Sequence, residues 1–154
     1  GGETLSLAAS IACIEFIRDH GVIRHLAQVG QQLSEGLKNI VSKLALDYVS
    51  LTGYPFRTLL SFSPAAGDPL AMKTLVQQEL IRRGILWSGI HNLCHAHGPA
   101  EIDYTLQAFA AVLPILKQAV AAKDVAARLK GRLLQPVFRK TSHFNTKPKS
   151  SVST

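Results

Sequence analysis

Hydrophobic positions recur at helical spacing through the first third of the chain, and this spacing predicts two helices. Residues 5–19 are almost continuously apolar, so we expect a largely buried helix there, ending at His20-Gly21. Apolar side chains return every three or four positions over residues 26–44, with polar side chains on the opposite side. That segment is predicted to be an amphipathic helix.

The period then changes to that of a strand. Residues 48–52 alternate and carry β-branched and aromatic side chains, which is typical of a half-buried strand. Gly53-Tyr54-Pro55 interrupts the pattern, and residues 57–62 resume it. Two further short strands are expected at residues 85–87 and 92–97.

Two more helices complete the pattern. One is predicted over residues 70–83 and closed by Gly84, and a long one follows Gly98-Pro99 and should be kinked or split by Pro114. Short adjacent strands favour antiparallel pairing. The predicted fold class is therefore α+β, with a small antiparallel sheet covered by helices.

Charge is distributed very unevenly along the 154 residues. The net charge is +7, but residues 130–154 carry six basic side chains and no acidic one, leaving 11 basic and 10 acidic side chains elsewhere. A basic segment rich in Ser, Thr and Pro is typical of a solvated tail. We expect no nucleic-acid partner; a basic-tail interaction module is kept as an alternative function.

Two other compositional features concern compartment and membranes. Cys13 and Cys94 are far apart and do not form a CxxC pair, which favours a reducing, cytoplasmic compartment. No uninterrupted apolar run reaches the roughly 18 residues of a membrane span, so no membrane partner is expected.

The strip "HNLCHAHG" is the most conspicuous chemical pattern. In a strand, His95 and His97 would share one face and Cys94 would point to the other, so a histidine metal-binding module is a second alternative. No nucleophile motif and no glycine-rich phosphate loop is present, and no catalytic or metal-ligating residue is assigned. Arg57 follows the Gly53-Tyr54-Pro55 break, and its guanidinium is a candidate for binding an anionic substrate group.

Read in order, several segments resemble the C-terminal small domain of class III pyridoxal-phosphate aminotransferases, closest to the glutamate-1-semialdehyde aminomutase-like branch. The resemblance covers roughly residues 1–139. It rests on "GGETLSLAASIACIEFI", "LTGYPFRTLLSFS", "LVQQELIRRGILWSG", "HNLCHAHGPAEIDYTLQAFAAVL" and "LLQPVFRK". The region "SGIHNLCHAHG" lacks the glutamate that the aminomutase carries there, which favours general aminotransferase chemistry.

The resemblance implies a division of the chain and a cofactor. Residues 1–21 would be a glycine turn and interdomain helix, 22–130 the small domain, and 131–154 a basic, disordered tail. Gly1 and Gly2 would remain from the loop that binds the phosphate of pyridoxal 5'-phosphate (PLP), and the Glu3 carboxylate should point away from that phosphate.

The same resemblance implies the activity of the intact enzyme. Its Schiff-base lysine would lie in a missing N-terminal large domain, so this chain alone is expected to be inactive. The whole enzyme would be a homodimer that moves an amino group between small molecules. Its substrate would be an amino acid, a semialdehyde or an amino sugar.

Overall fold

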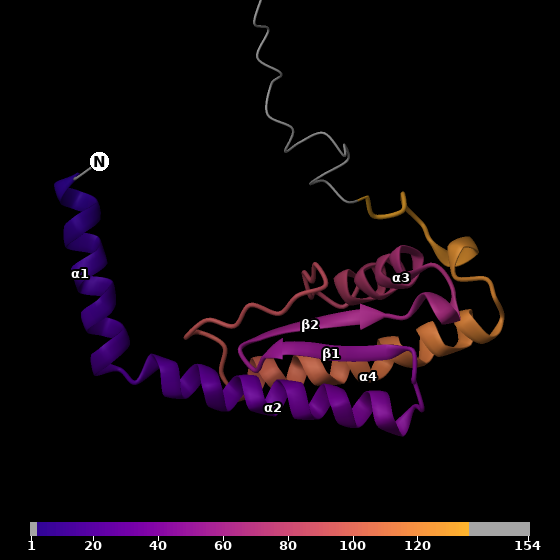
Figure 1. Ribbon diagram of the computed structural model, residues 1–154, viewed down its shortest axis with the longest axis horizontal. Coiled ribbons are helices and arrows are strands. Elements are labelled where there is room, and N and C mark those ends of the chain that lie inside the picture. The colour runs from indigo at the N-terminus through magenta and orange to yellow at the C-terminus, as the bar shows by residue number, and fades with distance from the viewer. Residues whose placement is uncertain (1–2, 136–154) are drawn as a thin grey trace, which may run out of the picture.

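The computed structural model describes residues 3–135 and has the predicted α+β architecture (Figure 1). Two strands form one antiparallel sheet, with Val49 opposite Phe62 at one end and Tyr54 opposite Arg57 at the other. The main elements of the described residues are α1 (Thr4–Asp19), α2 (Val22–Lys43), β1 (Val49–Tyr54), β2 (Arg57–Phe62), α3 (Pro69–Ile81) and α4 (Pro99–Ala121).

Three helices form a layer against one face of the hairpin. Helix α4 contacts both α2 and α3, while α2 contacts β1 and α3 contacts β2 (Figure 1). The hairpin therefore lies over a helical layer ordered α2, α4, α3. This arrangement buries the apolar stripe of each helix, as the sequence periodicity requires.

Helix α4 is the centre of the core. Phe109, Leu113 and Leu116 are completely buried, and Trp87 meets Phe109 edge-on with ring centroids 5.8 Å apart. By length and composition alone α4 is apolar enough to cross a membrane, but here it is the core helix of the domain. Pro114 was expected to kink or split it; the helix is not split and runs unbroken through that residue, between the buried Leu113 and Leu116.

A glycine in α2 lets the hairpin lie directly on that helix. A Cβ atom at Gly30 would fall 2.5 Å from the backbone carbon of Pro55 and 2.6 Å from the nitrogen of Phe56. No side chain fits in that space. Gly30 therefore fixes how closely the tip of the hairpin approaches α2.

The prediction that residues 5–19 form a buried helix is right about the helix and wrong about its burial. No residue of α1 is buried, and Leu5 and Ile14 are 75% and 65% exposed. The helix stands away from the rest of the domain (Figure 1). Its apolar side chains surround its axis instead of forming one stripe, and its main contacts within residues 3–135 are with the adjoining α2 and between Phe16 and His95.

The strands predicted at residues 85–87 and 92–97 are absent from the described structure. This segment is instead an irregular loop along the outer edge of β2, held by three backbone hydrogen bonds and one isolated bridge between Leu59 and Ile90. Gly89 has a positive φ of 101°, which interrupts regular extended pairing. In this loop Trp87 is buried against Phe109 of α4, whereas Leu86 is 90% exposed.

Candidate functional site

The open face of the hairpin is the surface best suited to contact a ligand. Along β2, Thr58, Leu60 and Phe62 point into the core, so Arg57, Leu59 and Ser61 lie on the opposite face. The strand register places Tyr54 opposite Arg57 and Thr52 opposite Leu59 on that same face. One cation, several hydroxyl groups and an exposed leucine are thus gathered on one surface.

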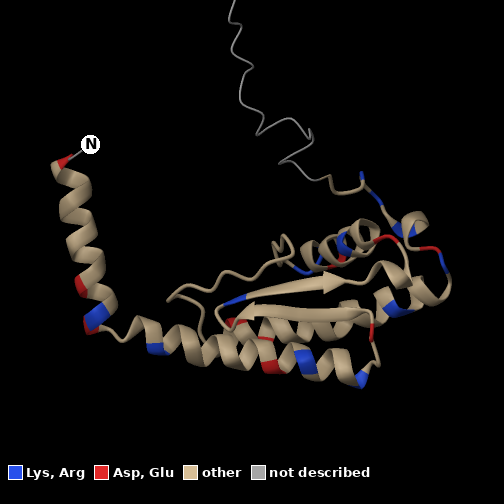
Figure 2. Ribbon diagram, viewed as in Figure 1, with Lys and Arg blue, Asp and Glu red and all other residues tan. Residues whose placement is uncertain are grey.

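Arg57 is exposed and begins β2. Figure 2 shows basic colouring at that end of the strand. The ion pairs of the described residues involve other arginines, and Arg57 has no acidic partner among them. Tyr54 and Phe56 stack beside it with ring centroids 5.7 Å apart. An unpaired guanidinium at the edge of an aromatic pair is suited to bind a carboxylate or phosphate through two parallel hydrogen bonds.

A buried polar pair fixes the strand directly behind Arg57. The Thr58 hydroxyl lies 2.9 Å from Nδ1 of His91, and the backbone N–H of His91 donates to the carbonyl of Thr58. Burial lowers the pKa of His91 to about 4, outweighing the opposite effect of its hydrogen bonding to Thr58. His91 is therefore neutral at physiological pH and serves as an anchor for the loop.

The three histidines of the "HNLCHAHG" strip do not converge. His91 faces Thr58 in the core, while His95 packs against the rings of Phe16 and His25. His97 turns back onto Cys94. The expectation that His95 and His97 share a strand face is wrong because they lie in a turn, and residues 3–135 contain no group of three potential metal ligands.

Glu3 has a local structural role in the described chain. Its carboxylate accepts hydrogen bonds from the backbone of Leu5 and Ser6 and from the Ser6 hydroxyl, and so caps α1. The Ser6 hydroxyl, followed by the two backbone groups, lowers the pKa of Glu3. The predicted phosphate ligands Gly1 and Gly2 lie outside the described residues, so their role stays a prediction.

The described residues do not provide a PLP site. Lys38 and Lys43 are exposed on α2, and the amine of Lys73 lies against Gly89, where a Cβ atom would be only 2.5 Å away. Lys123 borders a groove of about 480 Å³, but the Asp68 carboxylate in that groove already caps α3. Among residues 3–135, no lysine is paired with an acid free to bind a pyridine nitrogen.

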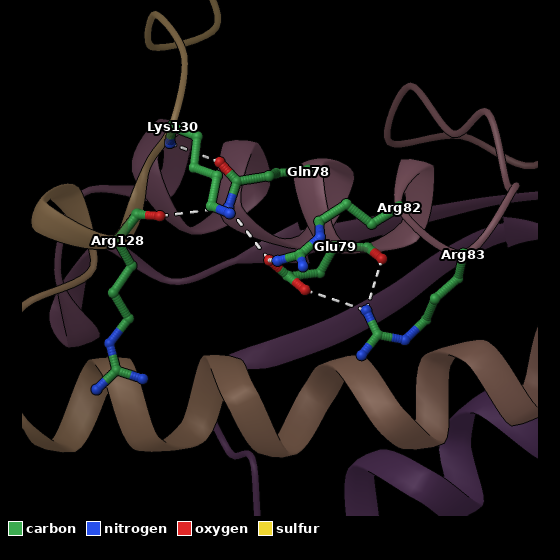
Figure 3. Close-up of polar contacts among 6 residues, drawn as sticks. All are labelled: Gln78, Glu79, Arg82, Arg83, Arg128 and Lys130. Atoms are coloured by element: carbon green, nitrogen blue, oxygen red, sulfur yellow. Dashed lines mark hydrogen bonds and ion pairs between the residues drawn. The ribbon is translucent and has the colours of Figure 1, made fainter.

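Sequence reasoning missed a polar cluster on α3 (Figure 3). Glu79 is 7% exposed and forms ion pairs with Arg83 at 3.1 Å and Arg82 at 3.4 Å. Burial alone would raise the pKa of Glu79, but hydrogen bonds from Gln78 and Arg83 outweigh it, and the net shift is downward. The i,i+3 and i,i+4 spacing of these charges was visible in the sequence, but the burial of Glu79 was not.

The same cluster holds the chain beyond α4 against α3. The Gln78 side chain donates to the carbonyl of Arg128 and accepts from the backbone N–H of Lys130 (Figure 3). Thr74 accepts a hydrogen bond from the backbone N–H of Leu134. Residues 131–134 of the predicted basic tail therefore lie on α3, and residues 136–154 lie outside the described part.

Comparison with known proteins gives one sequence relationship and one structural relationship. No protein-family model matches the chain. It is 29% identical over 117 residues to glutamate-1-semialdehyde 2,1-aminomutase from Desulfitobacterium hafniense, in strains DSM 10664 / DCB-2 and Y51. The match covers 69% of this chain and 27% of each relative, so the chain spans about a quarter of their length.

Among solved structures, the chain is similar to the FumI protein of Sphingopyxis sp. MTA144 in its PLP internal aldimine form. The TM-score is 0.65 at 20% sequence identity, covering 75% of this chain and 28% of FumI. At that identity the likeness shows the fold alone. Both relationships support the predicted resemblance: the chain is similar in sequence to part of the glutamate-1-semialdehyde aminomutases, and it shares the fold of part of FumI.

Proposed function

We propose that this chain is the small-domain part of a PLP-dependent class III aminotransferase. The support is the sequence match to glutamate-1-semialdehyde 2,1-aminomutase together with the fold shared with FumI. The whole enzyme would move an amino group on an amino acid, a semialdehyde or an amino sugar. The missing aminomutase glutamate favours transfer between two molecules over rearrangement within one.

In this proposal, the cofactor is held by a part of the enzyme other than residues 3–135. PLP supplies the electron sink for amino transfer when it is bound. Lys38, Lys43, Lys73 and Lys123 do not fit it, as their surroundings above show. The chain's own contribution is therefore to bind and orient the substrate, and to exclude water from the cleft that the small domain covers.

The single observation that carries this role is the unpaired guanidinium on the open hairpin face. Arg57 is fixed by the register with Tyr54, and the strand behind it is held by Thr58 and His91. A substrate carboxylate or phosphate bound there would be oriented by two hydrogen bonds and separated from bulk water by the neighbouring rings. The hydroxyl groups of the same face offer further hydrogen bonds to a polar substrate.

Helix α1 would connect this domain to the rest of the enzyme. It exposes Leu5, Leu7, Ile11, Ile14 and Phe16, and a helix that is apolar on all sides requires cover on all sides. We propose that the large domain and a second subunit of a homodimer provide that cover. Burying five such side chains would stabilise the assembly by on the order of 10 kcal/mol, before the free-energy cost of association is subtracted.

The test is amino transfer by the polypeptide expressed together with the reading frame that precedes Gly1. The proposal expects PLP-dependent transfer from an amino donor to a keto acid or aldehyde, at matched concentrations of cofactor and protein. Absence of both PLP binding and amino transfer in that longer polypeptide would overturn the proposal. The present chain serves as the control and is expected to be inactive.

A further inference from the structure

A groove lies between α3 and the chain that follows α4. Its volume is about 440 Å³, within the roughly 300–1,000 Å³ of small-molecule sites. The chain between Lys130 and Leu134 forms one wall. The residues of the other wall lie at positions i, i+3, i+4 and i+7 of one face of α3: Thr74, Gln77, Gln78 and Ile81. None of the open-face residues of the hairpin lines this groove, so it is separate from the candidate substrate site.

Hydrogen bonds hold the two walls together at both ends of the groove. The Gln78 side chain accepts from the backbone N–H of Lys130 at 2.7 Å and donates to the carbonyl of Arg128 at 3.2 Å (Figure 3). Further along the chain, the backbone N–H of Leu134 donates to the Thr74 hydroxyl at 3.1 Å. The groove is therefore formed by the protein's own contacts, and a ligand does not have to order its walls.

The charged side chains that line this groove are all positive. They are Arg82, Lys130 and Arg132, and no carboxylate among the described residues lines it. The side chains of Lys130 and Arg132 have no acidic partner within residues 3–135. Arg82 lies 3.4 Å from a Glu79 carboxylate that also pairs with Arg83 at 3.1 Å. The positive charge at the groove therefore exceeds what the neighbouring acid neutralises.

Between these cations the groove is aliphatic. Ile81 ends α3 with 49% of its surface exposed, and Leu134 is half-buried on the opposite wall. An apolar body that lay between these two side chains would remove them from water together with itself. The groove thus combines unpaired positive charge with an apolar surface, which is the complement of an amphipathic anion.

We propose that this groove is a second ligand site, which binds a phosphate monoester with an aliphatic body. A phosphate dianion matches the two unpaired cations, Lys130 and Arg132, and the guanidinium of Arg132 can donate two parallel hydrogen bonds to it. The aliphatic body lies on Ile81 and Leu134. The groove offers no acid to a pyridine nitrogen, so the site is distinct from a PLP site and does not depend on the proposed aminotransferase function.

The test titrates the whole chain with hexyl phosphate and follows amide chemical shifts by proton–nitrogen NMR. The backbone amides of Gly131 and Arg132 and the side-chain amide of Gln77 should shift together and saturate. Inorganic phosphate and hexanol each carry one half of this ligand, and each should bind there about tenfold more weakly or worse. Equal affinity for hexyl phosphate and either half, or no shift at these amides, would overturn the proposal.

A pair of double variants separates the groove from net charge. Lys130→Gln with Arg132→Gln should weaken hexyl phosphate binding by about fivefold or more, because it removes both unpaired cations. Arg24→Gln with Lys38→Gln removes two exposed cations of α2 and should leave the affinity within about twofold. Equal weakening in the two double variants would show that only the net charge matters and would contradict the site.

The aliphatic half of the site has its own readout. Ile81→Ser should weaken hexyl phosphate binding several-fold and leave the binding of inorganic phosphate unchanged, because only the hexyl chain contacts that side chain. An unchanged affinity for hexyl phosphate would contradict the place given to the aliphatic body. If this variant does not fold, the comparison of hexyl phosphate with inorganic phosphate in the unmodified chain decides.

Discussion

The hydroxyl of Thr58 and Nδ1 of His91 lie 2.9 Å apart in the core, joining residues that are 33 positions apart in sequence. This pair ties the irregular loop after α3 to β2, immediately behind the exposed Arg57. It holds, from the core side, the strand that carries Arg57. The consequences for stability can be measured in the chain by itself.

The first prediction concerns pH. His91 has a pKa of about 4 in the folded chain against 6.5 for the ordinary side chain, so the unfolded state binds more protons between these values. Stability from this group is complete above about pH 6.5 and is lost as pH falls toward 4. The loss should be about 3 kcal/mol over that window. Urea unfolding at several pH values measures it.

The matched variants for this prediction are His91→Leu and His20→Gln. Removing His91 should flatten the fall in unfolding free energy between pH 6.5 and 4, whereas removing the exposed His20 should leave it in place. A pH profile of His91→Leu that parallels the unmodified chain would show that another group is responsible.

The second prediction concerns the approach of the hairpin to α2. Gly30→Ala should destabilise the domain by about 1–3 kcal/mol although alanine favours helix, because its Cβ meets the backbone of Pro55. Gly36→Ala in the same helix meets only the flexible end of Leu106 and should cost less. Thermal unfolding of the two variants compares them, and an equal or reversed order would contradict the packing described.

The third prediction concerns the contact between α3 and the chain after α4. Gln78→Leu removes both the amide that donates to the Arg128 carbonyl and the oxygen that accepts from the Lys130 backbone N–H. Amide exchange at Lys130 and Leu134 should rise several-fold while the core of α4 stays protected. Gln77→Leu at the neighbouring position is the control and should leave amide exchange at Lys130 unchanged. Equal amide exchange at Lys130 in the two variants would contradict the role of Gln78 in holding the chain after α4 against α3.

The fourth prediction concerns Arg57. Because the side chain is exposed and unpaired in the described residues, Arg57→Ala should change the unfolding free energy by less than about 0.5 kcal/mol. In the longer polypeptide it should raise KM for an anionic substrate by about tenfold or more, with a smaller change for a neutral one. Arg57→Lys keeps the charge but loses the paired donors, so it should recover only part of the affinity. Equal KM values for all three proteins would exclude Arg57 from substrate binding.

Elements with a clear hydrophobic period were predictable from the sequence. Elements whose burial or pairing depends on other parts of the molecule were not. The amphipathic stripe of α2 and the alternation in β2 determined both elements closely, since each buries one side. The buried Ile102 and Phe109 of α4 likewise follow its periodicity. In these cases local pattern and tertiary packing agree.

The predictions from sequence were wrong in two regions, in each case for a physical reason. Helix α1 is apolar enough for a core, but nothing in residues 3–135 covers it, and composition does not show which part of a protein does so. The segment from Ile85 to His97 looks like strands because it contains short apolar runs, yet Gly89 breaks regular pairing. The Thr58–His91 and Cys94–His97 pairs depend on loop geometry, which periodicity does not encode.

The most direct test of the central claim is to incubate the purified chain with PLP and an amino donor, reduce with borohydride and map the labelled lysines. The account predicts no amino transfer, and only low, scattered labelling, because no described lysine is paired with an acid that could bind the pyridine ring. Stoichiometric labelling of one lysine together with amino transfer by this chain alone would contradict the account.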